Sequence, residues 1–272
     1  MPIAPPGGSD NCQYSVLPIV SSIYTPATTG TWTTINPASF VQDWTRPRRV
    51  ARTSTVATTR IGLELGSTTV GAGSAQNVEA FVIENTNFND IFIQGSNDGT
   101  NWVWSEVFVC TESDPDDGRR KMLCIPSTTF NYRYLRFGPN NAVSGATSYY
   151  VGIFSMWGRL DALDKNFSTP YEKTLLDDAP TVQFENGGLE VGLSSPVRIQ
   201  FALQARIERT NGVALDQYKA MALYPRDKTM LLFENMGDLT QVYHLRRTNS
   251  FRITRTENAT VTVSGIQFLE VA

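Results

Sequence analysis

Histidine and cysteine are scarce in this sequence, which narrows the chemistry that it can carry out. The 272 residues include one histidine, His244, and three cysteines, Cys12, Cys110 and Cys124. A histidine-based metal site needs two or three such ligands, and no cysteine pair has C-x-x-C spacing. The motifs G-x-S-x-G, H-E-x-x-H and the phosphate-binding loop are also missing. We therefore expect no metal and no cofactor, and we interpret His244 as a surface or hydrogen-bonded residue of a strand.

Long apolar runs and a large excess of charge are missing as well. No uninterrupted apolar run approaches the roughly 20 residues that span a bilayer, and the first ten residues lack the pattern of a signal peptide. The net charge is -3, which disfavours a broad basic face for nucleic acid. We expect a protein made in the cytoplasm, without membrane insertion and without a nucleic-acid partner. The odd number of cysteines does not favour a disulfide framework, although a pairing of Cys110 with Cys124 across two strands stays open.

Acidic residues keep one enzyme hypothesis open, because glycoside hydrolysis needs only two carboxylates about 5–9 Å apart. The sequence does not reveal whether any two of them face each other. A calcium loop is similar in composition to "ESDPDDG" but requires the order D-x-D-x-D-G, so a solvated turn is favoured there. We expect that the protein is not an enzyme. The carboxylates considered are Glu64, Glu79, Glu84, Glu106, Asp114, Asp116 and Asp117.

The residues that are abundant point to an all-β protein. Hydrophobic residues make up 41% and charged residues 18% of the chain, and Thr, Ser, Asn and Gly are frequent. Short alternating segments separated by turn residues, typical of a β-sandwich, recur between residues 60 and 158. In "GSNDGTNW" the pair Asp98–Gly99 predicts a tight turn in which Gly99 has positive φ. Trp102 and Trp104 follow it, and we expect Trp102 to anchor the core, with Trp104 on the same face.

The rest of the chain predicts three further regions. Residues 1–42 are rich in Pro, Thr and Ser, and we expect an extended N-terminal arm whose apolar side chains lie on a neighbouring subunit. The linker is expected at residues 161–180. A second β-rich domain with one short helix is expected at 181–272; in it, Asn186-Gly187 predicts a hairpin, "FALQARIE" fits either a strand or a helix, and Leu215, Tyr218 and Ala222 have helical spacing before Pro225.

Arginine is in excess over lysine, with 18 Arg against 5 Lys. Arg is favoured at protein contacts, although genome composition explains the excess equally well. The stretch "RPRRVAR" has no acidic residue between Asp43 and Glu64, and it either binds an anionic group or forms a solvated loop. The ligand-binding candidates are Trp44, Arg46, Arg48 and Arg49.

Residues 43–160 resemble the discoidin family, also called the coagulation-factor type C or galactose-binding-like domain. The resemblance rests on "RIGLELGS", "VEAFVIENTN", "IFIQGSNDGTNW", "YRYLRFG" and "YYVGIFSMWG". It implies an eight-stranded jelly-roll β-sandwich, whose relatives commonly bind glycans or lipid headgroups through loops at one end. The cysteine pair that joins the ends of the secreted members is missing here, which favours an intracellularly made version.

The order of segments also resembles small tail proteins of long-tailed bacteriophages. "DWTRPRRVARTSTVATTRIGLELGS", an "ENTN" strand end, and "MWGRLDAL" before a proline-containing linker carry this resemblance. It implies a virion component of the tail tip or baseplate, with other tail proteins, a second copy of the chain and a host surface glycan as partners. A free-standing carbohydrate-binding module of a polysaccharide-processing system is the alternative.

Overall fold

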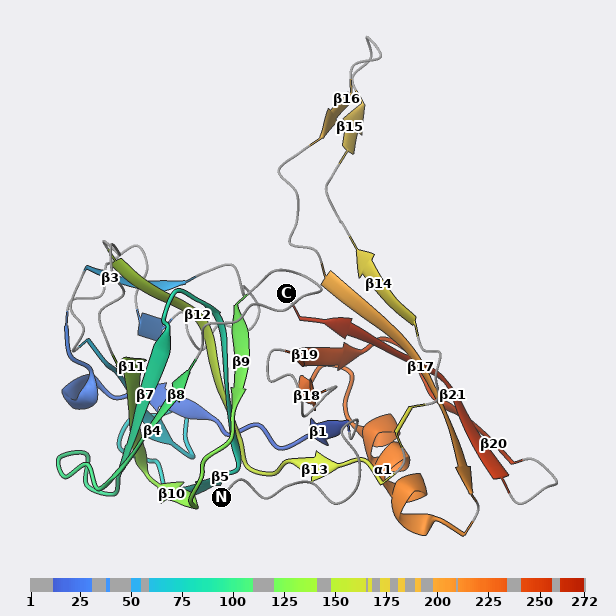
Figure 1. Ribbon diagram of the computed structural model, residues 1–272, viewed down its shortest axis with the longest axis horizontal. Helices are drawn as coiled ribbons and strands as arrows, with labels where there is room; N and C mark the ends of the chain where they lie inside the picture. Colours follow the sequence, from blue (N-terminus) through green and yellow to red (C-terminus); the bar gives the residue numbers. More distant parts are fainter. Residues whose placement is uncertain are drawn as a thin grey trace. The chain divides into compact units, whose positions relative to one another are not determined.

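The computed structural model describes most of the chain. The protein forms two compact units, one of residues 1–162 and 232–242 and the other of residues 163–231 and 243–272. Both are built mainly from antiparallel strands (Figure 1), so the predicted mainly β class is confirmed. The described residues are 12–30, 38–39, 50–54, 59–109, 120–140, 148–164, 166–167, 172–176, 181–183, 189–191, 198–208, 210–233, 241–255 and 260–271.

The first unit is a β-sandwich. Its larger sheet has the order β2-β4-β11-β7-β8, with bounds Ser21–Ile23, Ile61–Leu65, Tyr134–Pro139, Asp90–Ser96 and Trp104–Val109. Its second sheet has the order β3-β12-β6-β9, with bounds Ala51–Ser54, Ser148–Trp157, Ala80–Thr86 and Lys121–Cys124. Two short pairs complete the unit: β10 (Phe130–Tyr132) with β5 (Gln76–Val78), and β1 (Gln13–Ser15) with β13 (Asp161–Ala162).

Alternation of apolar side chains produces the core between the two sheets. Ile91 and Ile93 of β7 and Leu135 and Phe137 of β11 are buried there, while the residues between them point to the other face of the sheet. Phe137 stacks on a ring from the opposite sheet, Phe154, with 3.8 Å between the ring centroids. The strands lie where the pattern between residues 60 and 158 predicts them, because one buried face fixes the register of each strand.

The expected N-terminal arm differs from the structure over residues 12–30. Strand β2 pairs with β4, so that Ser22 lies opposite Glu64. The 3-10 helix η1 (Thr25–Ala27) follows and buries Ala27 against β4, where the missing side chain of Gly62 leaves room. Ile19 and Ile23 of this segment therefore pack against the chain's own sandwich, whereas Leu17 and Val20 stay exposed. Residues 1–11, 31–37 and 40–42 of the expected arm lie outside the described residues.

The Asp98–Gly99 turn forms as the sequence predicts, but Trp102 does not lie in the core as expected. Gly99 has a φ of 76°, the left-handed conformation that glycine adopts without strain. Trp102 is half-buried outside the core, whereas Trp104 is buried in it. The alternation expected from Trp102 does not apply because β8 begins only at Trp104. Val107 lies on the exposed face of β8, opposite to Trp104.

The second unit contains a sheet in which two 11-residue strands pair. These are β17 (Arg198–Glu208) and β21 (Thr260–Glu270), so the segment that fitted either a strand or a helix is a strand. In the expected linker, β14 (Glu172–Leu176) pairs with β17 along its full length. The remaining strands of the unit are β20 (Arg252–Arg255) and the hairpin strands β15 (Thr181–Gln183) and β16 (Leu189–Val191). Strands β18 (Met230–Phe233) and β19 (Val242–Arg247) contain residues of both units.

The described residues include one α-helix, α1 (Gly212–Leu223), as the sequence predicts. Asn211 caps it by accepting a hydrogen bond from the Ala214 N–H at 3.0 Å, and it ends two residues before Pro225. Its buried face consists of Ala214, Tyr218 and Met221. Tyr218 was expected on that face. No described helix has the length and the apolar character needed to cross a lipid bilayer.

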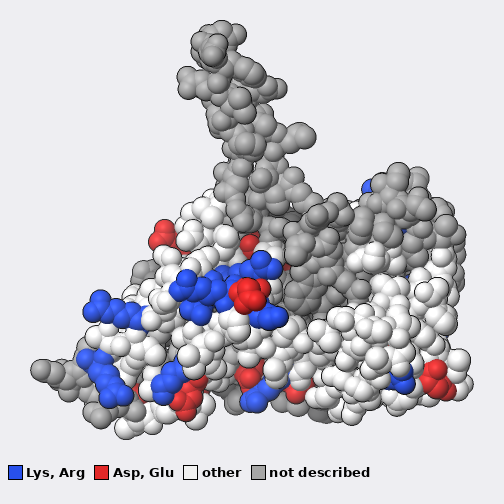
Figure 2. Space-filling view, turned by 180° about the vertical axis from the view of Figure 1, so that it is seen from behind, with Lys and Arg blue, Asp and Glu red and all other residues white. Residues whose placement is uncertain are grey.

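The charged side chains are distributed unevenly on the surface. In Figure 2, Lys and Arg gather around acidic side chains on the second unit, while the first unit shows few charges on that side. Strand pairing places Arg206, Arg246 and Arg252 on one face of the second unit's sheet, opposite to the face that buries Phe201 and Phe268. Cys12 and Cys124 are buried thiols rather than halves of a disulfide.

Candidate functional site

The ligand-binding candidates from the sequence, Trp44, Arg46, Arg48 and Arg49, lie outside the described residues. Their role therefore stays a prediction. The described part of the sandwich contains a different group of arginine and aromatic side chains, on the outer face of the larger sheet. Three of its arginines lie over aromatic rings: Arg133 over Tyr134, Arg136 over Trp102 and Arg60 over Phe92. We call this group the arginine–aromatic face.

The alternation of β11 and β7 positions this face. Leu135 and Phe137 point into the core, so Arg136 between them points outward. On the neighbouring strand Gln94 lies directly opposite Arg136, and Phe92 lies opposite Gly138. The same alternation that builds the core therefore places a guanidinium, an amide and a phenyl ring side by side on the outside.

Arg136 is held from two directions. Its guanidinium carbon lies 4.3 Å from the centroid of the Trp102 ring, and its Nε donates to Gln94 Oε1 at 2.6 Å. Burial lowers the pKa of Arg136, but a guanidinium stays protonated in proteins. Stacking and the Nε bond fix the plane of the fork. Within the described part of the chain, the two terminal nitrogens of Arg136 donate to no protein acceptor.

The Arg60 side chain passes over Gly138 to reach the ring of Phe92. Its Nη1 donates to Pro139 O at 2.8 Å, and its guanidinium carbon lies 5.2 Å from the Phe92 centroid. A Cβ on Gly138 would lie 3.1 Å from Arg60 Cδ and 2.2 Å from Thr59 O, so only glycine permits this approach. Burial and the charge of Arg136 lower the pKa of Arg60. The two guanidinium groups are thus close enough to repel each other.

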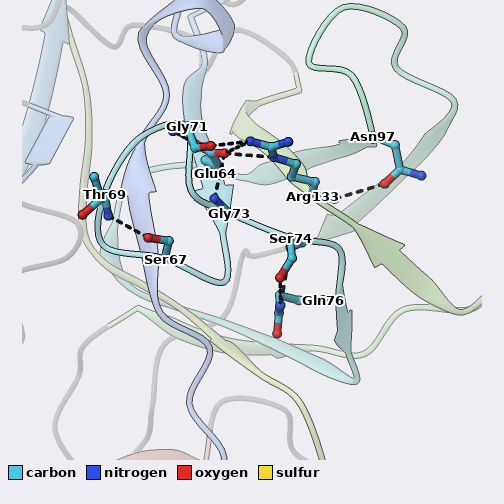
Figure 3. A network of polar contacts seen from close by, with 9 residues as sticks. All are labelled: Glu64, Ser67, Thr69, Gly71, Gly73, Ser74, Gln76, Asn97 and Arg133. Atoms are coloured by element: carbon cyan, nitrogen blue, oxygen red, sulfur yellow. Dashed lines mark hydrogen bonds and ion pairs between the residues drawn. The ribbon is translucent and has the colours of Figure 1, made fainter.

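Arg133 differs from Arg136 because it has a carboxylate partner. Figure 3 shows the guanidinium directed at Glu64, with Nε and Nη2 donating to Glu64 Oε1 at 2.9 and 2.6 Å. Glu64 is fully buried and also accepts hydrogen bonds from the N–H groups of Gly71 and Gly73. Burial alone would raise the pKa of Glu64, but these hydrogen bonds and the Arg133 charge lower it below the usual value. The network fixes the β4–β5 loop against Arg133.

The Asp98–Gly99 turn is attached to the same end of the sandwich. Arg133 N–H donates to Asn97 Oδ1 at 3.2 Å (Figure 3). The N–H groups of Asn101 and Thr100 donate to Asp98 and lower the pKa of its carboxyl well below the usual range. Trp102, the ring beneath Arg136, comes directly after this turn. The turn therefore determines where the indole lies.

The described carboxylates that the sequence offered for hydrolysis each contact or face a different group of the protein. Glu64 binds Arg133, Glu79 accepts from Leu160 N–H, and Glu106 accepts from Ser127 N–H. Glu84 is buried opposite Lys121 on the next strand. The described residues contain no cluster of three or more potential metal ligands. Asp114, Asp116 and Asp117 lie outside the described residues.

Sequence reasoning missed the arginine–aromatic face although a signal for it was present. In "YLRFG" and "FIQG" the polar residues Arg136 and Gln94 alternate with core residues, which predicts one polar face for each strand. Nothing in either segment reveals that these strands are neighbours, because the pairing of β11 with β7 joins residues far apart in the chain.

Solved structures resemble part of this chain. A family 32 carbohydrate-binding module from Clostridium perfringens NanJ in complex with galactose covers 54% of this chain and 99% of its own, at 12% identity and a TM-score of 0.36. A second such module, from a Clostridium perfringens family 31 glycoside hydrolase, covers 51% and 93% at 13% identity and 0.35. The lectin domain of lectinolysin, in complex with Lewis b, covers 53% and 94% at 11% identity and 0.35. No family model and no curated protein sequence matches the chain.

Proposed function

We propose that the sandwich is a carbohydrate-binding module that acts through the arginine–aromatic face. The observation that carries this proposal is the arrangement of Arg136, Gln94, Trp102 and Phe92 on one outer sheet face. Aromatic side chains provide apolar area for the C–H surfaces of a sugar, and a planar guanidinium and an amide provide hydrogen bonds to its hydroxyl groups. The resemblance of the sequence to the discoidin family supports the same function.

We further propose that the whole chain is a structural component of a bacteriophage tail tip or baseplate, and not an enzyme. The order of its segments supports this role. The Arg206, Arg246 and Arg252 face of the second unit fits it as well, because Arg is favoured at protein interfaces. The partners would be other tail proteins, further copies of this chain and a host surface glycan, and the location would be the virion.

The second candidate is a free-standing carbohydrate-binding module of a polysaccharide-processing system. It shares the arginine–aromatic face and differs in assembly. We would apply the purified full-length chain to a glycan array and measure its mass in solution by light scattering. Glycan binding by a monomer would favour the free-standing module, and binding by an oligomer the tail protein. A gene for a tape-measure protein next to this one would favour the tail protein independently. Absence of binding to any glycan would contradict both.

A further inference from the structure

We propose that the arginine–aromatic face selects glycans that carry a carboxylate, with Arg136 as the residue that binds it. This proposal rests on the proposed carbohydrate-binding function and specifies its ligand class. Its starting point is the contrast between the arginines of the face: Arg133 is neutralised by Glu64 at 2.6 Å, whereas Arg136 has no carboxylate partner within the described part of the chain.

The geometry of Arg136 suits a carboxylate. Contact with Trp102 on one side and the bond from Nε to Gln94 on the other fix the guanidinium plane, so its remaining donors are the two terminal nitrogens at the edge of the fork. A carboxylate matches two parallel N–H donors in a bidentate pair, and such charge-assisted bonds are about twice as strong as neutral ones. Because the fork is already ordered, little further conformational entropy is lost on binding.

The charges around Arg136 also favour an anionic ligand. Arg60 lies near enough to interact with it electrostatically, and its position over Phe92 is fixed by the bond to Pro139 O. A bound anion would reduce the repulsion between the two cations, which a neutral sugar would not do. On the same face of β7, Asp90 lies four residues from Gln94 along the strand, roughly 13 Å away at the usual rise per residue, too far for a contact ion pair at Arg136.

Apolar area near Arg136 favours a sugar over an isolated anion. Trp102 and Phe92 are both half-buried, so each ring retains some exposed surface. Val107 of β8 lies opposite Phe92 and is also exposed. A sugar ring that places its carboxylate on Arg136 would lie next to these apolar groups, whereas an inorganic anion would contact the fork alone. The described surface therefore combines one charged contact with apolar area, which matches a carboxylate-bearing sugar.

The test compares two soluble glycans on the full-length chain by isothermal titration calorimetry. One is 3′-sialyllactose, which carries a carboxylate, and the other is lactose, its neutral counterpart. We expect the acidic glycan to bind about tenfold to a hundredfold more tightly, as a hydrogen bond to a charged group implies, and the preference to weaken with salt. Equal affinities for the two glycans would overturn the selectivity and leave the proposed function intact. Failure of both glycans to bind would overturn the proposed ligand class, and the glycan array then decides whether the proposed function stands.

Variants locate the preference on Arg136. We expect R136Q to bind both glycans equally and R136K, which keeps the charge but loses the fork, to retain only part of the preference. The matched control is R159Q, because Arg159 is an exposed arginine of the same unit that forms its own ion pair with Asp161; its preference should equal that of the wild type. A preserved preference in a folded R136Q, checked by circular dichroism, would contradict the role of Arg136.

Two further ligands separate carboxylate recognition from general attraction to anions. A sulfated lactose tests whether any anionic sugar suffices, and a tetraglutamate peptide tests whether the sugar matters. We expect both to bind more weakly than 3′-sialyllactose. Equal binding of the sulfated sugar would overturn the selectivity for carboxylates. Equal binding of the peptide would show that the face binds acidic chains and would overturn the choice of a glycan.

Discussion

The guanidinium of Arg136 lies 4.3 Å from the centre of the Trp102 ring. This contact joins the middle of a sheet strand to the loop after a tight turn, so the indole covers a polar side chain on the surface rather than the core. The two tryptophans that follow the turn thus have different tasks, although they are two residues apart. Trp104 holds the sheets together, and Trp102 shapes the outer face.

Substitution of the two tryptophans should therefore affect stability to different degrees. Trp104 packs edge-on against Phe130 at 5.0 Å and donates its Nε1–H to Thr128 at 2.9 Å. We expect Trp104→Ala to reduce the free energy of unfolding by about 3–5 kcal/mol and Trp102→Ala by about 1 kcal/mol, the value of an exposed cation–π contact. Urea unfolding followed by tryptophan fluorescence measures both, because the sequence has no tryptophan after Trp157 and the second unit therefore contains none. An equal loss would place Trp102 in the core after all.

Gly99→Ala should destabilise the first unit more than Gly71→Ala does. Both glycines have positive φ, 76° and 88°, and a side chain costs about 1–2 kcal/mol in that conformation. Around Gly71 nothing lies within 4 Å of an added Cβ, whereas at Gly99 the Cβ would lie 2.6 Å from the Tyr24 hydroxyl. Two ring carbons of Tyr24 would also lie within 3.0 Å of that Cβ, so the excess cost of Gly99→Ala should shrink in a Tyr24→Ala background. An unchanged excess there would show that the Tyr24 side chain is not the obstacle.

Glu64→Gln should alter how stability depends on pH. The folded-state pKa of Glu64 is lowered, so its contribution is fully present above the unfolded-state pKa of about 4.3 and is lost as the pH falls through the lower folded value. We expect Glu64→Gln to cost about 1–3 kcal/mol at pH 7 and progressively less below pH 4. Urea unfolding at pH 7, 4 and 3 measures the difference. Asp216→Asn, at a carboxyl that is 75% exposed, is the control and should change little. A difference that stayed constant down to pH 3 would contradict the lowered pKa.

Asn211→Ala should weaken the start of α1. The Asn211 side chain accepts from Ala214 N–H and donates to Asp164, and loss of such a cap costs about 1 kcal/mol. Asn211→Ser keeps an acceptor at the cap and should recover most of the loss. Amide hydrogen exchange in the first turn of α1 measures the effect, which should leave the sandwich unchanged. Equal exchange in the wild type and the alanine variant would show that the cap contributes nothing.

The sequence predicted the strands of the sandwich well because each has a buried face that imposes a period of two. Segments such as "DIFIQGS" and "YRYLRFG" alternate plainly, and the helix of the second unit was indicated by Tyr218 and Pro225. The predictions were wrong where the residues concerned do not follow the alternation of a strand with one buried face. Trp102 precedes its strand, and β14 lies in a segment whose prolines suggested a linker.

The candidate site was harder to predict than the fold. The arginine–aromatic face combines β7 and β11, Arg60 before β4, and the loop after Gly99, and only the strand pairing brings these segments together. The strongest local signal, the cluster of Arg46, Arg48 and Arg49, lies outside the described residues and stays a prediction. A dense run of one residue type is easy to see in a sequence, whereas a site made of single residues from several strands is not.

The pairing of β2 with β4 has a practical consequence for anyone who wishes to isolate the sandwich. A recombinant fragment that started at residue 43, where sequence likeness begins, would omit Ser21–Ile23 and expose the hydrogen-bonding edge of β4, and exposed edges promote aggregation. Poor behaviour of such a fragment would reflect a missing border strand rather than an inability to fold. A recombinant fragment of the sandwich should therefore begin before Cys12.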